Sequence, residues 1–336
     1  MSLRAYVITR ILMTIPMILI LLTLVFLVMR VLPGNPVIAI VGMKASPEYI
    51  KKLEHQLGLD KPLWQQYLDY LGNLLKGDLG RSMIWGKRPV IQEIMDHFPA
   101  TLELTIGGFL VSVLLGLATG MVAGIRSGGK VDASMRIYSI VVYSLFIPLL
   151  GMMLQLVFGV WLHLLPVGGR IDPGMEPPPI TGLYVLDSII SLKMDSLLNS
   201  LAHLALPSFT LGLVLSGIYT RLVRSSLIEV LGQDFIRACK ARGLPGRAIL
   251  FKHALKNALI PILTMMGLQF ALLLAGAVLT ETTFSWPGMG TFLVERITYR
   301  DFTTIQGSIV FYALFVALVS LVVDLVYAYV DPRIRY

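Results

Sequence analysis

Residues 225–257 have the sequence SSLIEVLGQDFIRACKARGLPGRAILFKHALKN and lie between two long apolar segments. Apolar residues at helical spacing predict a first helix here: Leu227, Leu231, Phe235 and Ala238. Gly243 follows as a stop, and a second short periodic run covers 249–255. Six basic side chains accompany the two helices: Arg237, Lys240, Arg242, Arg247, Lys252 and Lys256. A plain connector between membrane helices needs no helical pattern, so this stretch predicts a basic helix–turn–helix that docks on a partner.

The composition places the chain among membrane proteins. It is 56% hydrophobic and only 14% charged, with a mean hydropathy of +0.77, whereas soluble proteins average about 25% charged residues. The net charge of +8 comes from alternate connectors and the two ends of the chain: Arg4 and Arg10, then Arg126, Lys130 and Arg136, then 225–257, and finally Arg333 and Arg335. This alternation follows the positive-inside bias of multi-span proteins and argues against a nucleic-acid partner. The single Cys239 cannot form an internal disulfide.

Six apolar segments are long enough to cross a bilayer, which takes about 20 residues per helix. They lie near 11–30, 102–125, 137–162, 199–221, 258–280 and 303–326. The first carries no charge from Ile11 to Met29 and is interpreted as a retained signal anchor. Six spans with basic ends place both termini in the cytoplasm. The predicted fold is therefore an all-α membrane protein with six transmembrane helices.

Two connectors on the extracytoplasmic side are long. The first, 32–100, is large enough to hold helices of its own: one begins at Ser46–Pro47 and stops at Gly58, and a second lies near 62–75. The second helix has an apolar face too short to span, so it lies on the outer surface or packs on the helix ends. The other connector, 166–197, is rich in Pro and Gly and is predicted to be a loop.

A stripe of small residues in the second span, Gly116, Gly120 and Gly124, allows helix backbones to approach closely. Packing within this chain is favoured over a subunit interface, and both can hold together. The run from Gly124 to Lys130 matches a phosphate-binding loop except at Val131, and it follows a membrane helix instead of a strand. It is therefore interpreted as a chance match, and this chain has no visible nucleotide site.

The middle of every span is uncharged, and His203 is the only titratable residue near one. Carriers driven by protons or sodium place carboxylates at mid-depth, so this absence argues against self-powered transport. Gln155 and Gln269 are polar groups at depth, and they either hydrogen-bond between helices or line a polar path. The five His residues lack metal-ligand spacing. No catalytic motif appears in the spans, which argues against an enzyme.

The segment from Asp234 through Gly243 and on to Pro261 resembles the cytoplasmic coupling motif of the membrane subunits of bacterial ATP-driven importers. The general motif opens Glu-Ala-Ala, whereas here it is Arg237-Ala238-Cys239, so the central Ala and the later Gly243 agree. Further segments fit in the same order: Leu32-Pro-Gly-Asn-Pro36, Leu57-Gly-Leu-Asp-Lys-Pro62, Thr280 to Gly290, Arg300-Asp301 and Gln306-Gly307. Together they cover nearly the whole chain, and they are most similar to the B-type permease of dipeptide and oligopeptide uptake systems.

The resemblance implies a single transmembrane domain over 1–336, with 32–100 as an extracytoplasmic helical loop and 225–257 as a cytoplasmic coupling segment in the bacterial inner membrane. It implies these partners: a second homologous permease, two ABC ATPase subunits that hold ATP and Mg, an extracytoplasmic solute-binding protein, a short peptide as cargo, and membrane lipid. No cofactor would be bound by this chain.

The same resemblance assigns ATPase coupling to Asp234, Arg237, Ala238, Arg242, Gly243 and Leu244, with Gly243 as the most important. The turn Trp286-Pro287-Gly288 shapes the exit of the fifth span, or it contacts the binding protein. Two other classes of function remain open at this stage. A stand-alone carrier or channel would give flux without an ATPase, and a scaffold would show no substrate dependence.

Overall fold

The computed structural model of the chain describes residues 3–31, 46–56, 58–82, 84 and 86–330. The Leu32–Pro36 segment, Leu57, and the basic residues Arg333 and Arg335 lie outside this part of the chain. Within it the ordered elements are helices, and the extended pairing described there is an isolated bridge between Arg81 and Pro89. The chain is therefore an all-α protein, as predicted. In chain order the helices are α1 (Leu3–Val31), α3 (Pro47–Gln56), α4 (Leu63–Leu75), α5 (Val90–Ile125), α6 (Lys130–Ser144), α7 (Ile147–Leu154), η1 (Gln155–Trp161), α8 (Tyr184–Ile190), α9 (Met194–Leu231), α10 (Asp234–Ala241), α11 (Gly246–Ala248), η2 (Ile249–Ala254), α12 (Leu255–Gly276), α13 (Val278–Thr283), α14 (Met289–Thr298) and α15 (Phe302–Val330), with η denoting a π-helix.

Four helices in the described ranges are long and apolar enough to cross a membrane as single pieces, namely those at Ile8–Arg30, Val90–Ile125, Met194–Leu231 and Phe302–Leu325. Two further spans exist only as bent pairs. The helix at Lys130–Ser144 meets Ile147–Trp161 at 99°, and Gly246–Leu259 meets Pro261–Leu274 at 49°. The predicted number of six is reached when each bent pair is counted as one span.

The third predicted span, 137–162, is therefore not one straight helix. Leu145 and Phe146 have extended backbone conformations, and the chain turns there before α7 begins. Pro148 lies in the first turn of α7, where its missing N–H costs nothing. In a continuous helix Pro148 would lack its hydrogen bond to the carbonyl of Ser144 and its ring would clash there, so the sequence supplies a local reason for the break. Apolarity alone could not distinguish this bent pair from a continuous span.

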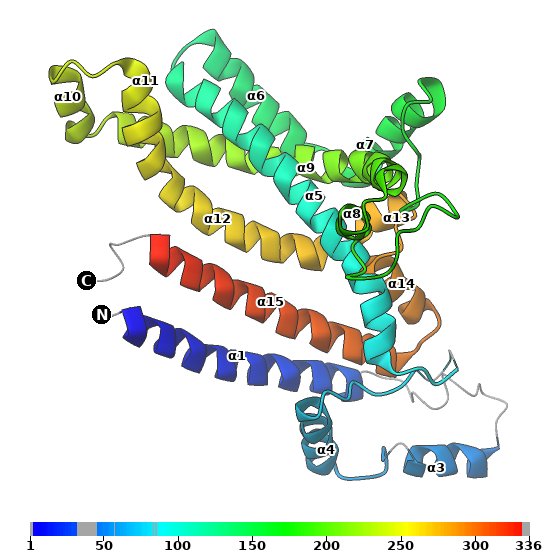
Figure 1. Ribbon diagram of the computed structural model, residues 1–336. Coiled ribbons are helices and arrows are strands. Elements are labelled where there is room, and N and C mark those ends of the chain that lie inside the picture. The colour runs from blue at the N-terminus through cyan, green and yellow to red at the C-terminus, as the bar shows by residue number, and fades with distance from the viewer. Residues whose placement is uncertain (1–2, 32–45, 57, 83, 85, 331–336) are drawn as a thin grey trace.

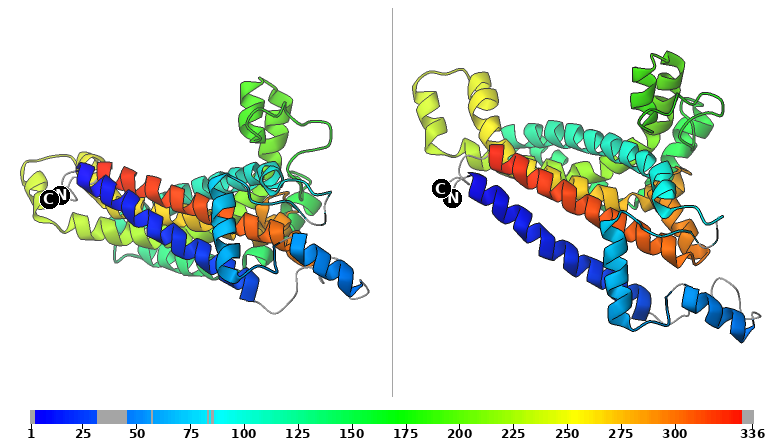
Figure 2. Two further views of the ribbon diagram at one scale, coloured as in Figure 1. Left: turned by 90° about the horizontal axis from the view of Figure 1, so that it is seen from below. Right: turned by 60° about the horizontal axis from the view of Figure 1, so that its bottom comes forward.

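The long helices lie side by side, and their ends define two faces of the molecule (Figures 1 and 2). The start of α1, the end of α15, and helices α10 and α11 lie at one end, which we call the α10 end. Helices α3, α4, α8, α13 and α14 lie at the opposite end, which we call the α8 end (Figure 1). Each end thus gathers connectors of one set, as expected for a chain that crosses a membrane repeatedly.

The paired helices α5 and α9 form the centre of the bundle. Of the most apolar stretch of α9, 56% is buried, compared with 11% for α1, which lies at the edge beside α15. One core cluster joins Ala100 and Leu104 of α5 to Leu211 of α9, Leu273 of α12 and Trp286. From Ile11 to Val28 the exposed side chains of α1 are apolar, which suits a helix that faces lipid.

Several element boundaries differ from the predicted ones. Helix α5 starts at Val90, well before the predicted 102, because the helical phase continues through the preceding polar residues. The connector 166–197 holds a helix, α8, instead of loop alone. The predicted helix through Leu227 and Ala238 is divided: α9 ends at Leu231, and α10 begins at Asp234 after an extended Gln233. Gly232, a poor helix former, marks the break.

Candidate functional site

Helix α10 projects from the bundle beyond the ends of the long helices (Figures 1 and 2). Within α10, Ile236 is buried and Cys239 is partly buried, while the other side chains are exposed. The predicted coupling residues Ala238, Arg242 and Leu244 are all on this exposed surface. Helix α10 packs one apolar face against its own protein and exposes its other side chains to solvent. A short helix with this arrangement has the form of a docking element.

A small apolar cluster fixes α10 to the ends of two spans. Ile236 packs with Leu227 and Val230 of α9 and with Ile249, Ala254 and Ala258 of the η2–α12 helix. These are the residues through which a push on α10 would reach both spans. Packed interiors transmit displacement because they have low compressibility. The geometry therefore joins the exposed helix to the fourth and fifth spans by direct contact.

Gly243 terminates α10 in a left-handed conformation, with a φ of +74°. The N–H of Gly243 donates to the carbonyl of Lys240 (2.9 Å), and the N–H of Leu244 donates to the carbonyl of Cys239 (3.3 Å). This pair of bonds is the Schellman pattern of helix termination. A Cβ at Gly243 would meet nothing within 4 Å. Within this chain the position therefore requires glycine for its backbone angle and not for lack of space.

The charged residues of α10 are available to a partner. Arg237 and Asp234 form a pair at 3.2 Å, with side chains 76% and 94% exposed. An exposed pair of this kind contributes about 0–1 kcal/mol to stability. Its energy is therefore small enough for either residue to exchange its partner on docking.

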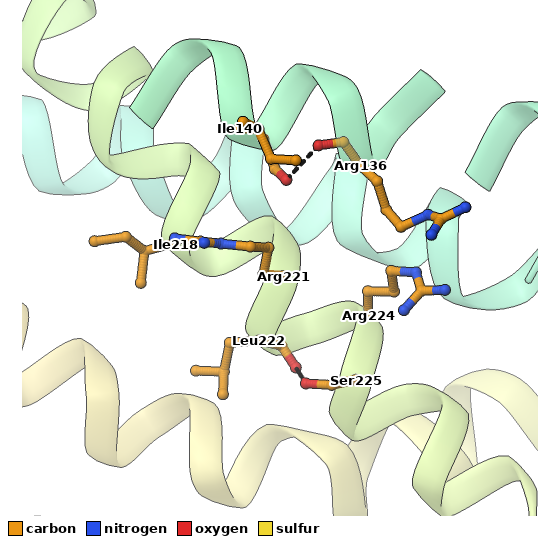
Figure 3. Close-up of a pocket in the computed structure, with 8 residues that line it drawn as sticks. Arg136, Ile140, Ile218, Arg221, Leu222, Arg224 and Ser225 are labelled. Atoms are coloured by element: carbon orange, nitrogen blue, oxygen red, sulfur yellow. Dashed lines mark hydrogen bonds between the residues drawn. The ribbon is translucent and has the colours of Figure 1, made fainter. Parts of the chain in front are cut away.

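A groove of about 510 Å³ lies between α6 and α9 toward the α10 end (Figure 3). Three arginines line it: Arg136 of α6, and Arg221 and Arg224 of α9. Arg224 donates two hydrogen bonds to Asp132, at 2.5 and 2.8 Å, and the Asp132 side chain is 1% exposed. Arg221 and Arg224 lie at the end of the predicted fourth span, 199–221, and the groove forms only when α6 packs against α9.

The glycine stripe Gly116, Gly120 and Gly124 faces α9. A Cβ on Gly116 would collide with the Cβ of Tyr219, and one on Gly120 would lie 2.9 Å from a backbone carbonyl of α9. These contacts leave no room for any side chain. The stripe lies where the two central helices α5 and α9 approach each other closely within this chain.

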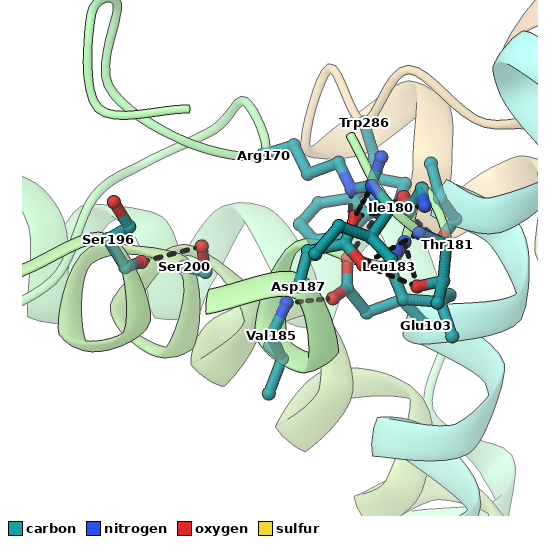
Figure 4. Close-up of polar contacts among 12 residues, drawn as sticks. Glu103, Arg170, Ile180, Thr181, Leu183, Val185, Asp187, Ser196, Ser200 and Trp286 are labelled. Carbon is teal, nitrogen blue, oxygen red and sulfur yellow. Dashed lines mark hydrogen bonds and ion pairs between the residues drawn. The ribbon is translucent and has the colours of Figure 1, made fainter. Parts of the chain in front are cut away.

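At the α8 end, a buried ion pair holds the 166–190 segment onto α5 (Figure 4). Arg170 donates to Glu103 (2.8 Å), and their side chains are only 7% and 6% exposed. The same guanidinium donates to the Gly182 carbonyl (2.6 Å) and stacks over the ring of Tyr184. Because breaking a buried pair leaves an uncompensated charge, this contact fixes the segment firmly.

Asp187 closes the turn that leads into α8. Its carboxylate accepts hydrogen bonds from the backbone N–H groups of Ile180, Thr181 and Gly182, and from the Thr181 hydroxyl at 2.6 Å. Burial by itself would raise the pKa of Asp187, but these hydrogen bonds outweigh it, so that the pKa is lowered. The predicted loop is therefore an ordered platform organised around a carboxylate.

Glu281 organises the Thr280–Gly290 segment. It is buried, accepts a hydrogen bond from the Thr101 hydroxyl of α5 (2.6 Å), and accepts two more from the backbone N–H groups of Gly290 and Thr291 at the start of α14. A Cβ on Gly288 or Gly290 would collide with the Glu281 carboxylate. This cap is not predicted from the sequence, and the spacing of one acidic residue and two glycines is the only local signal that could have indicated it. Its partner on α5 could not be foreseen.

The turn Trp286-Pro287-Gly288 is mostly interior. Trp286 is 1% exposed and its indole N–H donates to the carbonyl of Ala100 (2.8 Å), while Gly288 is buried against Glu281. Pro287 is exposed. Trp286 and Gly288 are therefore enclosed by other residues of this chain. The burial follows from the fit of the indole into the α5–α9–α12 cluster.

The two glutamines predicted to lie deep within the spans, Gln155 and Gln269, differ in position. Gln155 lies at the start of η1, and its side-chain amide donates to the carbonyls of Val167 and Thr283 (2.5 and 3.1 Å). It thus links the bent third span to the end of α13 by hydrogen bonding. Gln269 is half-buried on α12. No group of His, Cys, Asp and Glu able to hold a metal ion occurs in the described part of the chain.

Two family models cover nearly the whole sequence. "Binding-protein-dependent transport system inner membrane component" matches residues 116–336, and its N-terminal companion matches residues 3–105. The division between them falls in the second span.

Curated relatives match along their full length. The dipeptide transport system permease protein DppB of Alkalihalophilus pseudofirmus is 42% identical over 332 residues, covering 99% of both chains. The di/tripeptide transport system permease protein DppB of Pseudomonas aeruginosa is 42% identical over 93% of both chains. The glutathione transport system permease protein GsiC of Escherichia coli O6:H1 is 38% identical over 98% of this chain and 99% of the relative. Among solved structures, an inward-facing MetNI methionine ABC transporter matches with a TM-score of 0.51 at 14% identity, over 72% of this chain and 96% of the other. This last likeness concerns the fold alone.

Proposed function

Because this chain belongs to the family of binding-protein-dependent transport system inner membrane components, we propose that it forms half of a path for short peptides. It is a permease subunit of an ABC importer, and in such transporters the ATPase activity lies in separate subunits. The observation that carries the peptide assignment is 42% identity to dipeptide and di/tripeptide permeases along nearly the whole chain. The glutathione permease relative fits the same cargo class, since glutathione is also a short peptide.

The partners follow from this role. A second homologous permease completes the path, two ATPase subunits bind ATP and Mg, and a solute-binding protein delivers peptide on the far side. The α10 end faces the cytoplasm, with both termini, and the α8 end faces outward. The basic connectors at the α10 end support this orientation through the positive-inside bias.

Helix α10 is the coupling element in this proposal. Its exposed surface enters a cleft of an ATPase subunit, and the cluster around Ile236 passes the movement of that subunit to α9 and α12. The helix bundle then rocks as a rigid body between inward-open and outward-open states. Asp234, Arg237, Ala238, Arg242 and Leu244 contact the ATPase, and Gly243 sets the angle at which the chain leaves it.

At the α8 end, the ordered 166–190 platform is the surface offered to the binding protein. Arg170 and Asp187 stabilise it from within and are themselves buried, so contact would be made by neighbouring exposed residues such as Ile180 and Ile190. The exposed Pro287 lies on the outer turn of the fifth span and is a further candidate.

Reconstitution tests the function directly. The permease pair, the ATPases and the binding protein are placed in lipid vesicles, and uptake of a radiolabelled dipeptide is measured with and without ATP. We expect accumulation only when ATP, ATPase subunits and binding protein are all present. Gradient-driven flux through this chain alone would instead support the carrier or channel alternative. Assembly without any transport would support a scaffold.

A further inference from the structure

The groove between α6 and α9 combines charged and apolar side chains. Three guanidinium groups and two serines line it together with Ile140, Ile218 and Leu222. Arg224 is neutralised by Asp132, which also lies within 3.8 Å of Arg136. Three positive charges against one carboxylate leave a surplus of two in this part of the structure.

Arg221 points along the groove toward the middle of the span. In Figure 3 its side chain extends to Ile218, away from the neighbouring guanidinium groups of Arg136 and Arg224. Its guanidinium lies over the ring of Tyr143, 5.1 Å from the centroid. Tyr143 is about three helical turns further along α6 than Asp132, the anchor of Arg224. An arginine near a membrane surface ordinarily extends toward that surface, so Arg221 points in the opposite sense.

This face cannot lie against acyl chains. Charged side chains within membrane-spanning segments almost always face the bundle interior or a water-filled cavity. By contrast, the exposed positions of α1 at the opposite edge are large and apolar, including Ile8, Leu12 and Ile20. The α6–α9 face must therefore be covered by water or by another chain. A half-path that a second permease completes satisfies this requirement.

We propose that the α6–α9 groove is a cargo site within the path, in which Arg221 receives the C-terminal carboxylate of the peptide. This inference rests on the proposed function. The groove has the volume of small-molecule sites, about 300–1,000 Å³. Guanidinium binds carboxylate through a planar pair of donors. Within the described residues Arg221 contacts the Tyr143 ring and no carboxylate, so this guanidinium is open to an incoming anion. The apolar wall of Ile140, Ile218 and Leu222 accepts the side chain of the same terminal residue.

The test uses the complete importer in vesicles and a dipeptide whose C-terminal residue is the diazirine photo-leucine. Illumination during ATP-driven turnover should attach the peptide to residues 136–140 and 218–225. In Arg221→Gln we expect about a three- to tenfold loss of both crosslink yield and peptide imported per ATP hydrolysed. Arg126→Gln, which removes an exposed arginine outside the groove, should match the wild type in both measurements.

Specific results would overturn the inference. One is a set of crosslinks that map outside residues 136–140 and 218–225. Another is a crosslink yield in Arg221→Gln equal to that of the wild type. Dissociation of the permease pair in Arg221→Gln would assign this arginine to an acidic residue of the second permease instead. A defect seen only in vesicles with anionic lipid would assign it to a lipid phosphate. If the wild type takes up no peptide with ATP and binding protein present, the proposed function itself fails, and that outcome is distinct from all of these.

Discussion

Substitutions at Gly243 separate a backbone role from a contact role at the tip of α10. The residue has a φ of +74°, and open space surrounds the position of its missing side chain. An alanine there would carry the cost of the left-handed conformation, about 1–2 kcal/mol for an L-residue. Asparagine tolerates that conformation better than other residues, whereas a β-branched valine tolerates it worst. The backbone role therefore predicts the order Gly, Asn, Ala, Val.

The cost should appear in affinity for the ATPase subunit. Because the end of α10 is exposed, a substituted chain can relax the two Schellman hydrogen bonds when it is free and must restore them on docking. A cost of about 1–2 kcal/mol corresponds to roughly a 5- to 30-fold weaker association for Gly243→Ala. Gly243→Asn should stay within about threefold of the wild type, and Gly243→Val should lose more than alanine.

The assay is titration of purified ATPase subunits onto the permease pair in nanodiscs, with dipeptide uptake measured in parallel. The substitution Gly72→Ala, at an open helical position of α4, is the control for a harmless added methyl group. Equal losses for Asn and Val would show that the partner needs the space at position 243, and the backbone argument would be refuted. Full affinity in all three variants would remove Gly243 from coupling altogether.

Three further outcomes follow from the packing. Gly116→Ala drives a Cβ into a side chain of α9, so the melting temperature of this variant in detergent should fall by about 2–6 °C. Gly72→Ala should leave the melting temperature unchanged or raise it. Equal melting temperatures for the two variants would contradict the close packing at Gly116. The pKa of Asp187 is lowered in the folded chain, so its contribution to loop order is complete above about pH 4 and is lost as the pH falls below that value. At pH 7, Asp187→Asn should raise hydrogen exchange of the amides bound to it by about tenfold or more, and unaltered exchange would disprove the role. Trp286→Phe removes a buried hydrogen bond from the indole N–H to the Ala100 carbonyl of α5, at a cost of about 0.5–1.5 kcal/mol, whereas the exposed Trp161→Phe should show no such loss in the same thermal assay.

Local patterns in the sequence were sufficient to establish the class of fold, and they indicated where a docking segment lies. Hydropathy over about 20 residues identifies a helix that can lie in a bilayer, because the backbone there must satisfy its own hydrogen bonds. The position of Gly243 as a helix stop was also local information, since a left-handed residue favours glycine wherever it occurs. The basic periodic stretch 225–257 indicated a docking segment before any contact was known. Full-length resemblance added the family.

The division of that stretch at Gly232 was not foreseen, because Leu227, Leu231 and Phe235 keep a helical phase straight through the break. Periodicity shows which residues share a face of a helix, but it does not show where the helix axis changes direction. The same limit applied to the third span, whose apolar residues continue across the 99° bend after Ser144. Pro148 and Gly232 weaken the helix locally, and packing against neighbours then decides the direction in which the chain continues.

Contacts between distant residues belonged wholly to the tertiary structure. Glu103 and Arg170 are 67 positions apart, and nothing in their local surroundings marks them as a buried pair. Arg221 lies at the end of the predicted fourth span, and only the approach of α6 to α9 places it in a groove. Composition and spacing show how much apolar surface a segment can bury and which of its residues share one face of a helix. The partner of a charge depends on which helices meet in space, and the packing of the whole bundle sets that.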